Sequence, residues 1–479
     1  MKPYKTGGGV MMQKPAGRQK LSVFMLAMMN VAIIMNLRGL PMMAKEGLAM
    51  VFFLLFTTII FLLPTSLVSA ELATGWPTGG GVYRWIKEAF GGRLGFIAIW
   101  LQWIQNVIWY PTILAFAAGA LSYLFLDPAL AGNKLFNVVV ILGVYWGATL
   151  INFRGMKTSG WLTTAGVIGG TIFPAILIIG LGIVWWLKGN TLEFTLTSHS
   201  IFPDFSNFSN ISFLAGVILL FAGMEVSAVH ALEVKDPKRD YPKSIFLAAL
   251  MIVTIFTLSS LSIAAVIPVK KISLTSGIMQ GFKDLLNLFG MDWLLPVIGF
   301  LVAFGAIGAV TAWIIGPSKG LLATAKDGDL PPFLAHTNKN GVPTHILFIQ
   351  GLIVTVITLV YLLMPNVSSA FFLLTALTAI LYLIMYIMLF LAAIRLRYSQ
   401  PDVKRAYTVP GGNLGMWIVS GIGILGALFA IVVGLFPPSQ LAVGSPTFYL
   451  VFLIVGIAIF ATAPLVINLC KRPEWASKK

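Results

Sequence analysis

The sequence predicts an all-α membrane protein with twelve transmembrane helices, and three features of the chain lead to this fold class. The 479 residues are 58% hydrophobic and only 10% charged, whereas a soluble domain carries about 25% charged residues. The apolar residues form runs of the length, about 20 residues, that a helix needs to cross a bilayer. The lysines and arginines gather in the short segments between these runs, which is how membrane proteins encode their topology.

The apolar runs follow one another with no loop long enough to hold a soluble domain. They cover residues 21–46, 47–71, 93–126, 134–153, 158–187, 210–232, 243–268, 292–324, 344–364, 369–396, 413–437 and 445–470. Residues 1–20 are polar and basic and lack a small-residue cleavage site, so we interpret them as a cytoplasmic tail and not as a signal peptide. Residues 471–479 form a second, short cytoplasmic tail.

The basic residues also predict the orientation of the chain. Of the 32 lysines and arginines, 25 fall on one side of the predicted membrane and five on the other, with Arg38 and Lys45 inside the first run. The positive-inside rule therefore places both termini in the cytoplasm of a bacterium, with the spans in its inner membrane. The net charge of +16 does not indicate nucleic-acid binding, because the basic residues are dispersed among these loops.

Several function classes are disfavoured by what the chain lacks. The one cysteine, Cys470, excludes a disulfide framework. The four histidines have no ligand-like spacing, so we expect neither a metal nor a cofactor. No nucleophile with its base is visible, which argues against an enzyme. A channel would need a continuous polar pore, and a membrane sensor would need a signalling domain for which the tails leave no room. A secondary transporter fits best.

Two of the runs are interrupted by residues that are unusual inside a membrane helix. The first contains an N-L-R-G-L-P sequence at residues 36–41, and the sixth contains G-M-E at residues 223–225. The two runs begin consecutive groups of five spans, which predicts an inverted-repeat transporter with its substrate site near mid-membrane. We therefore assign residues 21–187 to a first five-helix repeat, 188–396 to a second, and 397–470 to two further helices.

Several segments carry the sequence patterns of one transporter family. They are GMEVSAVHALEVKDPKRDYP at 223–242, WIIGPSKGLLATAKDGDLPP at 313–332, NKNGVP at 338–343, TSLVSAELAT at 65–74, GGVY at 80–83 and PGG at 410–412. These segments resemble the bacterial glutamate/GABA antiporters of the amino acid–polyamine–organocation (APC) superfamily. The resemblance covers nearly the whole chain in order. It implies a LeuT-type fold, a 5+5 inverted repeat with two additional C-terminal helices.

The resemblance also implies where a substrate binds. In this superfamily the two broken helices bind the amino and carboxylate groups, and the matching residues here are Ile34, Met35, Asn36, Phe221, Ala222, Gly223 and Met224. Free N–H groups at half-helix N-termini suit a carboxylate, and free carbonyls at C-termini suit an ammonium. It further implies that Asn106 lines the pocket, that Trp313 packs over the substrate, and that Tyr382 and Tyr386 close the path to it.

The chain departs from these relatives in three places. Residues 34–36 read I-M-N where related exchangers have G-S-G, and Ala309 stands where the glutamate/GABA antiporters have a glutamate. These two differences leave the identity of the substrate open. Only residues 471–479 follow the last span, where those antiporters carry a long plug, so we expect substantial activity at neutral pH. The fifth run contains no lysine at the position where some members replace a sodium ion, so we expect exchange without sodium.

Three ionisable residues in or near the spans have two interpretations each. Glu225, interpreted as the only carboxylate deep in any span, could carry a proton or hold a broken backbone, and we favour the structural role. Arg38 could select anionic substrates or snorkel to the outer interface, and both interpretations stay open. For His230 we favour a packing role over proton coupling.

The sequence thus predicts an exchanger that moves a zwitterionic or acidic amino acid, similar to glutamate or GABA, against a related amino acid or decarboxylation product. A proton-coupled symporter and an amine or polyamine exchanger are the alternatives. The expected partners are amino acid or amine substrates and the lipid bilayer, with no nucleic acid. The sequence leaves the oligomeric state open.

Overall fold

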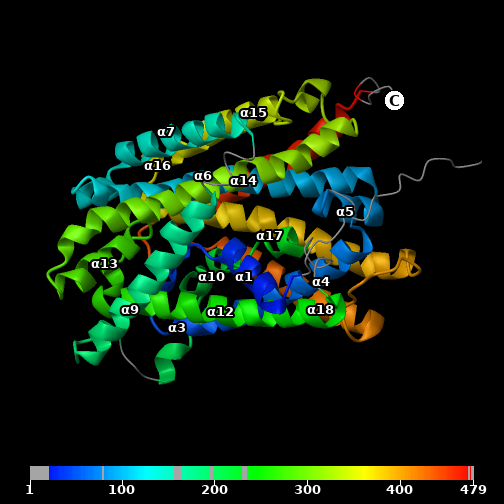
Figure 1. The fold of residues 1–479 in the computed structure, drawn as a ribbon. Coiled ribbons are helices and arrows are strands. Elements are labelled where there is room, and N and C mark those ends of the chain that lie inside the picture. Colours follow the sequence, from blue (N-terminus) through cyan, green and yellow to red (C-terminus); the bar gives the residue numbers. More distant parts are fainter. Residues whose placement is uncertain are drawn as a thin grey trace, which may run out of the picture.

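The computed structural model describes residues 21–77, 80–155, 163–194, 198–228, 235–472 and 475. Most of the helices in this part of the chain run along one common direction, as a bundle does when it spans a bilayer (Figure 1). Within the described residues, eleven helices are long and apolar enough to cross a membrane, and the count is twelve when the bent pair Val23–Ala32 and Leu37–Ala44 is taken as one span. The predicted all-helical membrane fold is therefore confirmed.

The spans follow the predicted order. The first five are built from α1 (Val23–Ile34), η1 (Leu37–Gly39) and α2 (Leu40–Ala44); α3 (Ala49–Thr57), η2 (Thr58–Leu62) and α4 (Leu63–Gly75); α6 (Gly92–Leu124); α7 (Lys134–Phe153); and η4 (Ile168–Ile172) with α9 (Phe173–Leu187). The next five are α10 (Leu214–Leu220) with α11 (Met224–Ser227), α12 (Pro237–Val266), α14 (Leu295–Lys326), α15 (Thr344–Thr358) with α16 (Val360–Leu363), and α17 (Val367–Ser399). The last two are α18 (Gly412–Gly434) and α19 (Pro446–Leu469).

Shorter helices lie between the spans or, as η6 and η9 do, at the start of a span. They are α5 (Val82–Phe90), α13 (Gly277–Asn287), η3 (Pro128–Gly132), η5 (Ser198–Ile201), η6 (Phe208–Ile211), η8 (Val269–Lys271), η9 (Asp292–Leu294) and η10 (Pro332–Ala335). In Figure 1, α5 and the C-terminus lie at one end of the bundle and α13 at the other.

Both predicted breaks are present. Helix α1 ends at Ile34, Met35 and Asn36 adopt extended backbone angles, and the helix axis turns by 55° before the chain continues at Leu37. Helix α10 ends at Leu220, and α11 starts after Gly223, which has a φ of +119°. Only glycine adopts that angle without strain, so Gly223 permits the second break. The repeat boundaries at residues 187 and 396 stay predictions.

The two broken spans pack against each other beside the breaks. A Cβ atom added at Gly39 would lie 2.3 Å from the Leu220 side chain, so a larger residue at this position would require the Leu220 side chain to move. Helix α6 is largely buried and packs against both α14 and α17, whereas α19 faces outward. The unwound segments are therefore enclosed by protein, as non-helical backbone inside a membrane must be.

Ion pairs collect at the end of the bundle that is predicted to be cytoplasmic. Lys87 on α5 pairs with Asp327 at 2.6 Å, and Lys471 after α19 pairs with Asp329 at 2.6 Å. Partial burial alone would raise the pKa of Asp327, but hydrogen bonds from Lys87 and Tyr83 outweigh it and the pKa is lowered. The contacts of Lys87 and Tyr83 hold α5 against the end of α14, and that of Lys471 holds the end of α19 there.

The predicted orientation can be tested with the only cysteine of the chain. Cys470 follows α19 and is exposed. If both termini are cytoplasmic, a membrane-impermeant maleimide should label Cys470 in permeabilised spheroplasts and leave it unlabelled in intact ones. Lys270→Cys in a Cys470→Ser background, on the opposite side, should already be labelled in intact spheroplasts. Equal labelling of Cys470 in intact spheroplasts would contradict the orientation.

Candidate functional site

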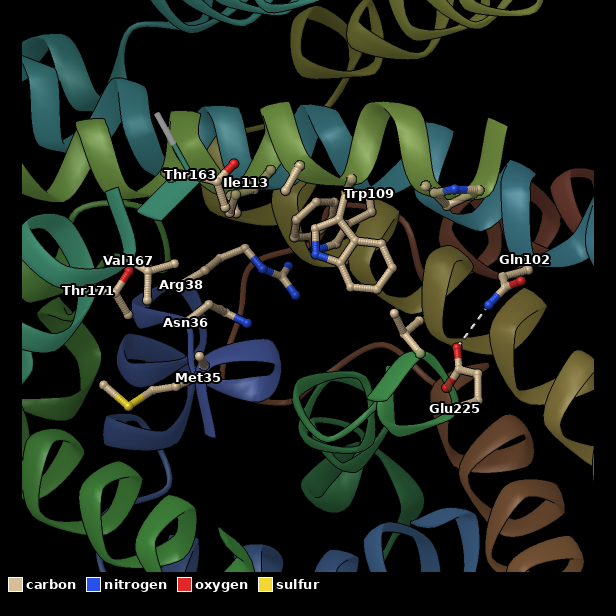
Figure 2. Close-up of a pocket in the computed structure, with 18 of the residues that line it drawn as sticks. Met35, Asn36, Arg38, Gln102, Trp109, Ile113, Thr163, Val167, Thr171 and Glu225 are labelled. Atoms are coloured by element: carbon tan, nitrogen blue, oxygen red, sulfur yellow. Dashed lines mark hydrogen bonds between the residues drawn. The ribbon is translucent and has the colours of Figure 1, made fainter. Parts of the chain in front are cut away.

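A cavity of about 630 Å³ lies where the sequence predicted the substrate site, between the two breaks, helices α6 and α14, and the part of the fifth span that precedes α9. Figure 2 shows part of its lining, with the first break on one side and Glu225 on the other. The first break contributes residues 35–38, α11 contributes Glu225 and Val226, and α6 contributes Ile99, Gln102, Trp109, Ile113 and Phe116. Most of the remaining wall comes from small or apolar residues of α14 and of the fifth span.

Arg38 extends into this cavity from the first break (Figure 2). Its Nη1 donates hydrogen bonds of 3.1 Å to the hydroxyls of Thr112 on α6 and Thr375 on α17, and its guanidinium lies over the Phe371 ring. Only 2% of the residue is exposed. The snorkelling interpretation is therefore wrong for this conformation, because the side chain is fixed inside the bundle between α6 and α17.

The charge of Arg38 has no protein counter-ion in the described part of the chain. The ion pairs found there involve other residues, and the Nε atom of Arg38 is buried without a hydrogen-bond acceptor. An unpaired buried cation is costly. A carboxylate bound in the cavity would supply the missing partner.

Glu225 lines the other side of the cavity and is 3% exposed. Its carboxylate accepts hydrogen bonds from the hydroxyls of Tyr382 and Tyr386 on α17 and a 2.9 Å bond from Gln102 Nε2 on α6. The backbone N–H of Gly223 in turn donates to the Tyr386 hydroxyl at 2.8 Å. Glu225 thus fastens the second break to two other spans, which agrees with the favoured structural role and leaves the proton-carrier role as a hypothesis.

Two tryptophans form an aromatic part of the wall. Trp313 on α14 lines the cavity, and its ring packs edge-to-face against Trp109 on α6 with centroids 6.3 Å apart. The Tyr110 hydroxyl donates to the Trp313 carbonyl at 2.9 Å, which fixes α14 against α6. Trp109 lies between the Arg38 and Glu225 sides of the cavity (Figure 2). An aromatic surface here can pack against the hydrocarbon part of a substrate or against an ammonium group.

The structure brings some of the predicted substrate-binding residues into the cavity and leaves others outside it. Met35, Asn36, Arg38, Glu225 and Trp313 line the cavity. Ile34, Asn106, Phe221, Ala222, Gly223, Met224 and Tyr382 do not line it in this conformation. The Asn106 amide donates to the Gln102 carbonyl of its own helix, and Phe221 packs against Phe256. Their roles in binding stay predictions. His230 lies outside the described residues.

Other lining residues were not singled out from the sequence. Gln102, Trp109, Ile113 and Phe116 fall at helical spacing on one face of α6, a pattern that could have identified this face. Lys319 on α14 was counted only among the topology-setting cations, yet it lines the cavity. Ala309 also lines it, so this wall carries a methyl group where the antiporters that the chain resembles have a carboxylate. Within the described residues, no group of three or more His, Cys, Asp or Glu side chains could hold a metal.

Comparison with known proteins decides the family. The model of the family described as amino acid permease matches residues 21–459. The chain belongs to the amino acid permease family. This permease is 44% identical over 447 residues to an uncharacterised transporter of Legionella pneumophila, covering 93% of this chain and 96% of that protein.

Two further relatives carry more specific names. A glutamate/gamma-aminobutyrate antiporter of Lactococcus lactis is 34% identical over 455 residues, covering 94% of this chain and 90% of that protein. A probable agmatine/putrescine antiporter of the same species is 27% identical over 399 residues, covering 83% and 84%. The permease is therefore a multi-span membrane transporter and not an enzyme, and its resemblance to the glutamate/GABA antiporters is confirmed.

Proposed function

We propose that this permease exchanges a zwitterionic or acidic amino acid, similar to glutamate or GABA, for a related amino acid or its decarboxylation product by alternating access. The observation that carries the proposal is the buried guanidinium of Arg38, which lines the cavity and has no carboxylate partner in the described part of the chain. Arginine binds carboxylates through a planar fork of donors. A substrate carboxylate would therefore complete this site.

We expect the end of α1 to supply acceptors for a substrate ammonium in the same cavity. Helix α1 ends at Ile34, and Ala32 and Met35 beside its last turn line the cavity. The last carbonyls of a helix lack intrahelical partners, and such half-helix ends bind cations in transporters of this architecture. The faces of Trp109 and Trp313 add an aromatic surface that favours an ammonium.

The named relatives support the same substrate class. The Lactococcus lactis relative named a glutamate/gamma-aminobutyrate antiporter is more similar to this permease than the one named a probable agmatine/putrescine antiporter. Agmatine and putrescine are dications, which Arg38 would repel. Exchange of amines is therefore the second candidate function, and the counterflow test below includes it as a possible outcome.

The proposal can be tested by counterflow in proteoliposomes. Vesicles that contain the purified permease and are preloaded with unlabelled glutamate or GABA should accumulate external labelled glutamate or GABA, whereas empty vesicles should not. Preloading with agmatine or putrescine should give no stimulation. Equal accumulation in empty and preloaded vesicles would contradict exchange. Strongest stimulation by putrescine would show an amine exchanger.

Trp313→Leu should lower the exchange rate about tenfold, which corresponds to about 1.4 kcal/mol, a typical contribution of an aromatic contact. Trp313 lies on the cavity wall against Trp109, and leucine removes the ring while keeping an apolar side chain. The measurement is the initial counterflow rate per folded protein. Trp417→Leu on α18, where the ring is 52% exposed, is the control and should exchange like wild type. An unchanged rate in Trp313→Leu would remove this residue from the site.

A further inference from the structure

The cavity extends toward one end of the bundle and is covered toward the other. Toward the α5 end, residues 80–82 and Ala323 line the cavity, and the lining residues Ala312 and Gly316 are exposed. Toward the α13 end (Figure 1), the first break continues into α2, and α10 leads into the second break. Every residue of these two helices is buried. A substrate can therefore enter from the α13 end only after α2 and α10, the outer halves of the two broken spans, have moved.

The two outer halves pack against each other and against α13. A Cβ atom added at Gly216 on α10 would lie 2.6 Å from the Met42 sulfur on α2. One added at Gly277, the first residue of α13, would lie 2.8 Å from Pro41 Cβ on α2. The outer halves therefore form one packed unit between the cavity and the α13 end.

The loop between α18 and α19 (residues 435–445) reaches both outer halves through one side chain. The Gln440 Nε2 atom donates a 2.9 Å hydrogen bond to Glu46 Oε1 and a 3.1 Å bond to the Asn210 carbonyl. Glu46 follows α2, and Asn210 lies in η6, just before α10. A side-chain amide nitrogen carries two hydrogens, so this one group can serve both acceptors at once.

Other contacts fasten the same loop to its surroundings. The Ser439 N–H donates to the Ser209 carbonyl at 3.1 Å, on the second broken span only. The Ala442 carbonyl accepts a 2.8 Å hydrogen bond from the Ser369 hydroxyl on α17. Of the hydrogen bonds named for this loop, those of Gln440 are the ones that join both broken spans to a helix pair outside the two five-helix groups.

We propose that Gln440 is a positioning residue that holds the outer halves of both broken spans closed over the cavity, and that its two hydrogen bonds break when the cavity opens to the α13 end. The inference rests on the alternating access of the proposed function but not on the identity of the substrate. Alternating access moves one part of the bundle against another around the site. A contact made in only one of two states shifts the equilibrium between them by its own free energy.

The experiment measures the accessibility of the cavity from the α13 end in the full-length chain. The reporter is Ala306→Cys in a Cys470→Ser background, because Ala306 lines the cavity, is 6% exposed and precedes Trp313 on α14, on its α13 side. A membrane-impermeant methanethiosulfonate reagent is added to intact membranes. Lys270→Cys, exposed at the α13 end, identifies the preparation, spheroplasts or inverted vesicles, in which this end faces the reagent.

We expect Gln440→Met to raise the initial labelling rate of Ala306→Cys at least about fivefold, because a hydrogen bond typically changes an equilibrium constant by about that factor. Methionine keeps the length of the side chain and removes both donors. A second reporter, Ala323→Cys, lines the cavity toward the α5 end and should react no faster from that side. General loosening of the protein would instead accelerate both reporters. Gln440→Ala should act in the same direction and serves if Gln440→Met does not fold.

Gln280→Met on α13 is the matched control. The Gln280 amide donates to the Lys271 carbonyl at 3.3 Å and accepts from the Ser273 N–H at 2.9 Å, so it loses two hydrogen bonds at the same end of the bundle without freeing a broken span. Both reporters should react in this variant as they do in the wild type.

Three outcomes would overturn the inference: wild-type labelling in the Gln440 variants, equal effects of the Gln440 and Gln280 variants, or faster labelling of both reporters. If the wild type exchanges amino acids and the Gln440 variants label like wild type, only the inference fails. If the wild type exchanges no amino acid but the Gln440 variants open the cavity to the α13 end, the proposed substrate class fails and the role of Gln440 stands.

Discussion

Arg38→Glu is expected to reduce the uptake of acidic amino acids by about 100-fold or more and that of neutral zwitterions less. The substitution replaces the unpaired guanidinium in the cavity wall with a carboxylate, which repels the substrate carboxylate that we propose binds there. A hydrogen bond to a charged group contributes about 1.5–3 kcal/mol, and each 1.4 kcal/mol is a factor of ten. The measurement is the ratio of glutamate to GABA exchange in proteoliposomes.

Arg38 also holds α6 and α17 together through Thr112 and Thr375, so total activity alone would not separate selection from folding. Arg38→Lys keeps the charge and should preserve much of the preference for acidic substrates. Arg38→Ala removes the charge and should weaken acidic uptake more than neutral uptake, though less than Arg38→Glu does. A folded Arg38→Glu protein with the wild-type ratio of acidic to neutral uptake would show that this charge does not select the substrate.

The fold could be predicted from the sequence because its determinants are local. Each span is a run of about 20 apolar residues, and each break carries residues that interrupt such a run, as Gly223 does with its positive φ. The two interrupted runs also predicted where the cavity lies, because a substrate site was expected beside the two breaks. The environment of Arg38 could not be predicted, because the two hydroxyls that hold it lie 74 and 337 positions away in the chain.

The sequence also could not show which individual residues of a helix line the cavity. Asn106 was assigned to the pocket by likeness to related exchangers, but its amide bonds back to the Gln102 carbonyl, and the neighbouring Trp109 lines the cavity. Which residue of a helix reaches a cavity depends on the rotation and neighbours of that helix, which periodicity alone does not give. Tyr382, another predicted substrate-binding residue, does not line the cavity but donates a hydrogen bond to Glu225, which does, and its role in binding stays a prediction.

A second buried carboxylate in the spans, Glu71, was not singled out from the sequence. Glu71, at the end of the second predicted run, is 1% exposed and belongs to the span Ala49–Gly75. Its carboxylate binds Arg397 through two bonds of 2.5 and 2.6 Å and lies 3.5 Å from Arg405 Nε. The sequence could not show this cluster, because both arginines come more than 320 positions later in the chain.

Glu71→Ala is expected to destabilise the permease by about 3–5 kcal/mol, the usual cost of removing one partner from a buried ion pair. The substitution leaves the guanidinium groups of Arg397 and Arg405, which are 10% and 7% exposed, beside each other without a carboxylate. It also removes the acceptor of the 2.7 Å hydrogen bond from the Val409 N–H. Because Arg397 lies in the last turn of α17, the helix that carries the two tyrosines bound to Glu225, the loss should also loosen the wall of the cavity.

The measurement is the unfolding of the purified protein in detergent, with Glu88→Ala as the matched control. Glu88 pairs with Arg84 across one turn of α5, but its side chain is 23% exposed and that of Arg84 is 40% exposed, so this pair should contribute no more than about 1 kcal/mol. Glu71→Gln keeps the size and one acceptor oxygen and should fall between Glu71→Ala and wild type. If Glu71→Ala unfolded at the same temperature as Glu88→Ala, the buried cluster would not be what fastens α4 to α17.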